Sequence, residues 1–197
     1  MFCVTSIKHK GTVTINTPRL VLRRLTEEDA QNMYNNWASD EKVPKYLSWN
    51  IHESVETTRE LLATWVAEYE KPEHYQWVIE YDGAIVGTVG LHAVSDKHER
   101  CEMGYNIGSK WWNKGIVTEA VGAVINFVFT ELNMNKVCAL HDTENIGSGR
   151  VMQKNGMKQE GLLYEHSVRK DGTRGNLAYY AIIKSEWKNY RGNIYEH

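Results

Sequence analysis

The stretch E-M-G-Y-N-I-G-S-K-W-W-N-K-G-I-V-T-E-A, residues 102–120, decides the fold because a strand changes into a helix within it. Residues 100–107 alternate between larger apolar side chains and small or polar ones, which is the period of a β-strand. From residue 116 to residue 132, valine and alanine recur at the spacing of one helical face. The segment therefore predicts a strand that leads through a short loop into the start of a long helix.

The loop between this strand and this helix has the chemistry of a site for a phosphorylated ligand. The first amides of a helix lack an intrahelical acceptor, and the helix dipole favours negative charge beside them. Gly115 lets the backbone approach a ligand, while Lys110 and Lys114 add positive charge. The alternative is a tight turn with solvated lysines, because the loop has no Walker-type Gly-Lys-Ser/Thr and no Gly-x-Gly-x-x-Gly sequence.

Outward from this segment, the chain alternates between strand and helix patterns. The turns at Asp82-Gly83 and Asp171-Gly172 separate pairs of β-rich segments. The predicted order is β-α-α-β-β-β-α-β-α-β-β, for which a mixed sheet with helices on both faces is the simplest architecture. We expect one domain over residues 1–197, with a core at about 17–188. The predicted strands are 19–25, 75–81, 84–91, 100–107, 136–141, 158–168 and 175–184, and the helices begin near Thr26, Ser54, Ile116 and Asn145.

The composition is that of a soluble globular protein with no special stabilising device. A chain of 197 residues buries about 70% of its unfolded surface as one domain. Cys3, Cys101 and Cys138 form no short-spaced pair, so we expect free thiols in a reducing cytoplasm. A formal net charge of −2 argues against a protein that mainly binds nucleic acid. We expect no membrane segment, no signal peptide and no metal, since His92 and His98 lack further ligands at a suitable spacing.

Three ordered motifs in this chain resemble the GNAT superfamily of N-acetyltransferases, specifically the branch that contains ribosomal-protein-alanine N-acetyltransferases. The resemblance covers roughly residues 17–188. The first motif binds acetyl-CoA in the family, the second follows it along the chain, and the third closes the domain. The matching residues are Gly104-Tyr105, Trp112, Gly115 and Thr118-Glu119-Ala120; then Asn145, Ser148, Asn155-Gly156-Met157 and Glu160-Gly161; and finally Ser185-Glu186-Trp187.

The resemblance implies an α/β (mixed α+β) fold with about seven mostly antiparallel strands, splayed between strands four and five. It also implies that acetyl-CoA lies in the gap, its pantetheine arm paired with the backbone of the fourth strand. Val117 departs from the superfamily pattern of glycine or alanine, and we expect it to crowd the pyrophosphate slightly. The expected cofactor-binding residues are Tyr105, Asn106, Ile107, Trp112, Asn113, Lys114, Gly115, Ile116, Val117, Thr118, Asn145 and Ser148.

Acetyl transfer from a thioester to an amine requires removal of a proton from the amine and benefits from an acid near the departing thiolate. By its position in the motif, Ser148 is the expected acid, although a serine at a helix start is also a common cap. Glu160 and Glu102 are the candidate bases, directly or through a water, and either could instead be an exposed or ion-paired carboxylate. His141 is a third candidate for the base, unless it is merely packed or hydrogen-bonded.

The acceptor amine is left open by the sequence. Tyr46, Trp49 and His52 either line the acceptor pocket or cover the helices, and Tyr164 and His166 present the same two alternatives. The branch similarity favours a protein N-terminal α-amine of the kind found on a ribosomal protein. The alternatives are a small amine such as a polyamine or an aminoglycoside, or a non-catalytic acyl-CoA-binding module. We expect a cytoplasmic monomer or homodimer that contacts no nucleic acid directly.

Overall fold

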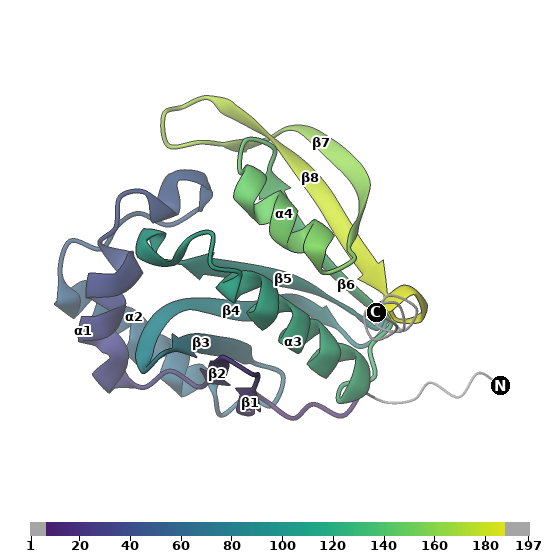
Figure 1. Cartoon of the computed structure of the whole chain (residues 1–197), viewed down its shortest axis with the longest axis horizontal. Coiled ribbons are helices and arrows are strands. Elements are labelled where there is room, and N and C mark those ends of the chain that lie inside the picture. Colours follow the sequence, from purple (N-terminus) through teal and green to yellow (C-terminus); the bar gives the residue numbers. More distant parts are fainter. Residues whose placement is uncertain (1–6, 188–197) are drawn as a thin grey trace.

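The computed structural model describes residues 7–187, which form one eight-stranded sheet with the order β1-β2-β3-β4-β5-β6-β8-β7 (Figure 1). All neighbouring strands are antiparallel except β5 and β6, which are parallel. The strands are β1 (Ile15–Asn16), β2 (Leu20–Arg23), β3 (Tyr75–Tyr81), β4 (Ala84–Ser95), β5 (Arg100–Ile107), β6 (Lys136–Asp142), β7 (Lys158–Val168) and β8 (Arg174–Ile183). The α-helices are α1 (Ala30–Met33), α2 (Val55–Glu68), α3 (Ile116–Thr130) and α4 (Ile146–Lys154).

Helices cover both faces of the sheet, with α3 and α4 on one face and α1 and α2 on the other (Figure 1). Strand β3 shows how the sequence supports both layers. Trp77 and Ile79 are fully buried in the main core together with α3, whereas Val78 between them is buried with α1 and α2. Successive side chains of a strand point to opposite faces, so a continuous apolar run marks a strand that is covered on both sides.

The predicted fold class is confirmed, and the strands at 75–81, 100–107 and 158–168 begin and end where the sequence placed them. The sheet has one strand more than expected, because the two-residue β1 pairs with Val21 and Leu22 and is too short to leave a periodic signal. The predicted fourth and fifth strands are therefore β5 and β6. Within residues 7–187, no helix is both long and apolar enough to cross a membrane.

The first helical region is less regular than the pattern predicted. A 3₁₀ turn (Glu27–Asp29) leads into α1, and a π-helical turn (Tyr34–Ala38) follows it. The wider turn is held by Ser39, whose amide and hydroxyl both donate to the carbonyl oxygen of Tyr34, at 3.1 and 2.7 Å. Such local hydrogen bonds compete with the regular helical pattern, and the spacing of apolar residues gives no sign of them.

Candidate active site

Strands β5 and β6 are paired only at their beginnings. Three residues of β5 face β6, the last of them being Glu102 opposite Cys138. Beyond Glu102, β5 continues to Ile107 along β4, while β6 continues to Asp142 along β8. The two strands therefore separate, and past this point no strand in residues 7–187 pairs with the β6-facing edge of β5. A free strand edge presents backbone donors and acceptors that can pair with an extended ligand.

The predicted cofactor residues Tyr105, Asn106 and Ile107 all lie on this free part of β5. The side-chain amide of Asn106 donates to the Thr88 hydroxyl at 2.7 Å. Its Oδ1 atom is buried and has no hydrogen-bond partner among the described residues. A buried acceptor without a partner is costly, so Asn106 suits a site that is completed by a ligand donor such as an amide N–H.

The loop after β5 has the backbone geometry expected of an anion site at a helix start. Asn113 and Gly115 both adopt positive φ angles, 61° and 73°, and Gly115 caps α3 without any side-chain hydrogen bond to the helix amides. Asparagine and glycine tolerate this left-handed conformation best. Lys110, Trp112, Asn113 and Lys114 are exposed, so the loop combines free helix amides with positive charge.

Val117 lies differently from what its place in the motif suggested. Its side chain is 9% exposed and packs in the main core beside Ile116, which is 1% exposed. The valine side chain therefore fills the core beneath α3 and leaves little of its surface at the loop. Ile116, Val117 and Thr118 could therefore contact a ligand mainly through their backbone amides.

Residues distant in sequence hold the loop at both of its ends. At its start, Asp40 accepts a hydrogen bond from the amide of Ser109 at 3.0 Å. At its end, Arg19 donates to the carbonyl oxygen of Lys114 at 3.1 Å and to Glu119 at 2.6 Å. Burial raises the pKa of Glu119, but the hydrogen bonds from Thr17 and Arg19 outweigh this and keep it below its usual value. The sequence marks Glu119 only as part of a motif, and it gives no signal for Arg19 or Asp40, whose partners lie 95 and 69 residues away.

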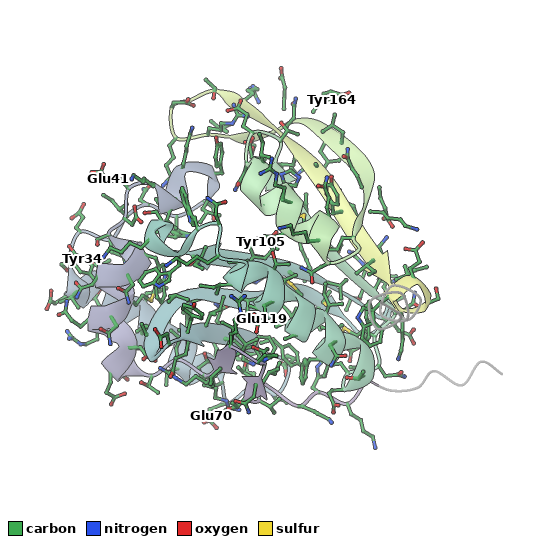
Figure 2. All side chains as sticks on the ribbon, in the orientation of Figure 1. Tyr34, Glu41, Glu70, Tyr105, Glu119 and Tyr164 are labelled. Atoms are coloured by element: carbon green, nitrogen blue, oxygen red, sulfur yellow. The ribbon has the colours of Figure 1, made fainter. Side chains whose placement is uncertain are left out.

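Helix α4 carries the two predicted residues on the opposite side of the gap. The side chain of Asn145 accepts a hydrogen bond from the Ser148 amide at 3.2 Å and is therefore an N-cap. The hydroxyl of Ser148 lies 3.0 Å from the hydroxyl of Tyr105, so it is not used as a cap. Tyr105 reaches from β5 to α4 and lies between α3 and α4 in Figure 2. The structure thus brings Tyr105, Asn145 and Ser148 together across the gap.

The two candidate bases lie in different surroundings. Side chains alternate along β5, so Glu102 faces the opposite side of the sheet from Tyr105, at the residue where β5 and β6 separate. The side chain of Glu102 is half-buried, and its carboxylate forms no hydrogen bond or ion pair with any other described residue. Glu160, by contrast, forms an ion pair with Lys136 at 2.5 Å, and its strand β7 is separated from β5 by β8 and β6.

Two histidines are close to these groups. His141 contacts the carbonyl oxygen of Asp142 through Nδ1 at 2.8 Å, and its ring packs against Gly149 of α4. His92 of β4 stands directly opposite Glu102, and its ring lies over Gly104, where a Cβ atom would be 2.9 Å from Nε2. The sequence brings His92 to notice only as a metal ligand. Directly opposed side chains on neighbouring strands are within contact range, so His92 lies near Glu102. Among residues 7–187, no three His, Cys, Asp or Glu side chains are grouped to hold a metal ion.

The expected acceptor-site residues Tyr46, Trp49 and His52 lie on the segment between α1 and α2. The rings of Trp49 and His52 are 6.0 Å apart, and His52 is tied to Thr58 by a hydrogen bond of 2.8 Å. Burial lowers the pKa of His52. The carbonyl oxygen of Trp49 accepts a hydrogen bond from Lys170 in the β7–β8 turn, so this segment meets the far hairpin.

Tyr164, the further aromatic candidate, lies apart from all of these. It is 75% exposed on the edge strand β7 and is seen at the rim of the molecule in Figure 2. His166, two residues later on the same strand, is also exposed.

Comparison with known proteins agrees with this geometry. Residues 19–158 match the family model described as an acetyltransferase (GNAT) domain. The uncharacterized N-acetyltransferase YoaA of Bacillus subtilis is 31% identical over 86% of this chain and 96% of its own length. A GNAT-family acetyltransferase structure from Bacillus anthracis superposes with a TM-score of 0.76 at 25% identity, covering 88% of this chain and 99% of that chain.

Relatives named for an acceptor are more distant or match less of the chain. The putative ribosomal N-acetyltransferase YdaF of Bacillus subtilis is 29% identical over 68% of this chain and 74% of its own length. The spermidine N(1)-acetyltransferase of Escherichia coli is 31% identical, but over only 51% of this chain and 56% of its own length.

Proposed function

The chain belongs to the GNAT acetyltransferase family and is an acetyl-CoA-dependent N-acetyltransferase, and from this premise we propose that its acceptor is the α-amine of a protein N-terminus, such as that of a ribosomal protein. The observation that carries the proposal is the carboxylate of Glu102, which has no side-chain partner within residues 7–187 and lies at the point where β5 and β6 separate. We also infer one catalytic domain, because a single sheet spans residues 15–183.

The residues present fit acetyl-CoA in the gap between the strands. The free edge of β5 at Tyr105, Asn106 and Ile107 would pair with the pantetheine arm, and Asn106 Oδ1 offers a buried acceptor without a protein partner. The first amides of α3 and the exposed lysines Lys110 and Lys114 would bind the pyrophosphate.

The site residues divide the chemistry between two faces of the sheet. Acetyl-CoA supplies the thioester, whose carbon–sulfur bond breaks as the amine nitrogen bonds to the carbonyl carbon. Glu102 accepts the proton that the amine loses, directly or through a water, and passes it to solvent. Ser148, on the other face, donates a hydrogen bond to the sulfur, which leaves as a thiolate and takes a proton from water after release.

An α-amine suits this site better than a more basic amine does. An α-amine has an unperturbed pKa of about 7.7–8.0, against about 10.4 for a lysine-type amine. Its proton is therefore held less tightly near pH 7, and a single carboxylate can accept it more easily. A polycation would also need several unpaired acidic groups. On the β6 and β7 side of the gap, Glu160 is paired with Lys136, and Asp142 and Glu144 are both paired with Arg169, so these three carboxylates are not available to a polycation. The putative ribosomal N-acetyltransferase YdaF also matches a larger share of this chain, 68%, than the spermidine N(1)-acetyltransferase does, 51%.

A thiol-release assay with acetyl-CoA tests the proposal. The acceptors are peptides with free N-termini, the same peptides with a blocked N-terminus and an internal lysine, spermidine, and an aminoglycoside. We expect free coenzyme A only with unblocked peptides, at a rate that depends on the first residues. The blocked peptide is the matched control, because it retains every contact except the α-amine.

Two results would contradict the proposal in different ways. Turnover of spermidine or the aminoglycoside alone would move the function to small amines. Binding of acetyl-CoA without thiol release by any of these amines would favour a non-catalytic acyl-CoA-binding module.

A further inference from the structure

The side chain of Tyr105 joins the two sides of the gap between β5 and β6. Tyr105 lies on the free part of β5, three residues past the last residue paired with β6. Its hydroxyl is 3.0 Å from the carbonyl oxygen of Ser148 and 3.0 Å from the Ser148 hydroxyl. The sequence predicted only main-chain contacts for Tyr105, so its side chain has a place in the site that the motif did not reveal.

The Tyr105 hydroxyl has one hydrogen and two acceptors within reach. In one arrangement it donates to the carbonyl oxygen, which leaves the phenol oxygen free to accept the serine hydrogen. In the other arrangement, Tyr105 donates to Ser148 Oγ, and the serine hydrogen is free to point elsewhere. Burial keeps the pKa of Tyr105 well above its usual value, so the phenol keeps its hydrogen throughout the neutral range.

Ser148 itself is already held on its backbone side. Its amide donates to Asn145, so the helix start is fixed and only the side-chain torsion decides where the hydroxyl hydrogen points. The tyrosine approaches from the strand on which the thioester is expected. A donor at this position both orients Oγ and stabilises negative charge that builds up near it.

We propose that Tyr105 is the positioning residue of Ser148: its hydroxyl donates to Ser148 Oγ and so directs the serine hydrogen toward the sulfur of coenzyme A. The inference rests on the role given to Ser148 in the proposed function. Tyr105 transfers no proton and touches no reacting atom. It prevents the serine hydrogen from turning back to the phenol oxygen and so favours the arrangement in which Ser148 stabilises the thiolate.

Titration of the thiol of bound coenzyme A tests this without any acceptor amine. The ultraviolet absorbance of the thiolate is followed against pH for coenzyme A bound to the unaltered protein, to Tyr105→Phe, to Ser148→Ala and to the double variant. We expect Ser148→Ala to raise the pKa of the bound thiol by about one unit, because a hydrogen bond to a charged group is lost. Tyr105→Phe should raise it in the same direction, and the double variant should show no more than the Ser148→Ala shift.

Tyr180→Phe is the matched control. The Tyr180 hydroxyl accepts a hydrogen bond from Gln153 of the same helix at 3.1 Å, and its residue is 6% exposed, so the substitution removes a buried tyrosine contact to α4 away from Ser148. We expect the thiol pKa to be unchanged in this variant. Both phenylalanine variants retain the aromatic ring, and their unfolding temperatures show whether the fold is intact.

An unchanged thiol pKa in Tyr105→Phe would overturn the inference. So would a double variant whose shift is the sum of the two single shifts, since the two hydroxyls would then act independently. An equal shift in Tyr180→Phe would also overturn it, because the effect would come from general loosening of α4. Failure of the proposed function is seen separately, as absent thiol release from acetyl-CoA with amines while this titration remains readable.

Discussion

On the β5 side of the gap, the loop before α3 offers backbone amides, whereas on the β6 side α4 offers the hydroxyl of Ser148. Distant side chains shape the loop: Asp40 holds its start, and Arg19 with Glu119 holds its end. On the other side, a single helical turn and one tyrosine contact place the serine. A site made of backbone amides tolerates substitution of its own side chains, whereas a site that depends on one hydroxyl loses its function when that oxygen is removed.

The difference suggests that the two sides do different work. A ligand bound by backbone amides and helix dipole is bound equally well before and during the reaction, so the loop should govern affinity. Groups that meet developing charge should govern turnover. Substitutions on the loop are therefore expected to change the affinity for acetyl-CoA, and substitutions at Glu102 or Ser148 to change kcat.

Glu102→Gln should have the largest effect and act on turnover alone. Loss of a positioned base typically lowers rates by about 10²- to 10⁴-fold, and the amide cannot accept the amine proton. The Kd for acetyl-CoA, measured by calorimetry, should be unchanged. Glu160→Gln is the matched control: its carboxylate is 42% exposed and paired with Lys136, so we expect less than about a threefold change. A larger loss in Glu160→Gln than in Glu102→Gln would assign the base to β7.

Gly115→Val should instead weaken acetyl-CoA binding by about 100-fold, the loss of one or two hydrogen bonds to a charged phosphate. Gly115 has a φ of 73°, which a β-branched residue adopts only with strain, so the loop must change shape. Gly172→Val is the control, because Gly172 has a φ of 82° in the β7–β8 turn and open space around it. Both variants should lose stability, but only Gly115→Val should lose affinity. If Gly115→Val and Gly172→Val bound acetyl-CoA with equal affinity, the loop would not be the pyrophosphate site.

Ser148→Ala should lower kcat by about 30-fold, the value of one hydrogen bond to a developing charge. The Kd for acetyl-CoA should change by less than about twofold, because the bond forms mainly as the sulfur departs. Rapid-mixing measurements of thiol release together with equilibrium binding separate the two quantities. Small and equal changes in kcat and in the Kd for acetyl-CoA would mean that Ser148 only helps to form the start of α4.

The same contrast explains which parts could be predicted from the sequence. The shape of the loop could be predicted because a glycine at a left-handed position and a helix start both leave local signals in the sequence. The environment of Glu160 could not be predicted, since Lys136 comes from β6 and reaches it across β8. For Tyr105 the sequence predicts only main-chain contacts with the cofactor, because no local signal shows that its hydroxyl meets a helix 43 residues later. His92 likewise gains a possible role only through the register that sets it against Glu102.

The smallest effect expected is on stability, at the ion pair that precedes α4. Asp142 accepts two hydrogen bonds from Arg169, at 2.7 and 2.9 Å, and one from the Glu144 amide in the turn that leads to Ser148. The Arg169 guanidinium lowers the pKa of Asp142, so the pair stabilises the fold above the unfolded value of about 3.9 and is lost as the pH falls through the folded value. Asp142→Asn should therefore cost about 1–2 kcal/mol in urea unfolding at pH 7 and at pH 5, and progressively less as the pH is lowered below about 3.9. Glu119→Gln, whose partner Arg19 is 43% exposed against 15% for Arg169, should cost less than Asp142→Asn at pH 7. A difference between the unaltered protein and Asp142→Asn that does not shrink as the pH is lowered below about 3.9 would mean that shape, and not charge, makes Asp142 important on the α4 side.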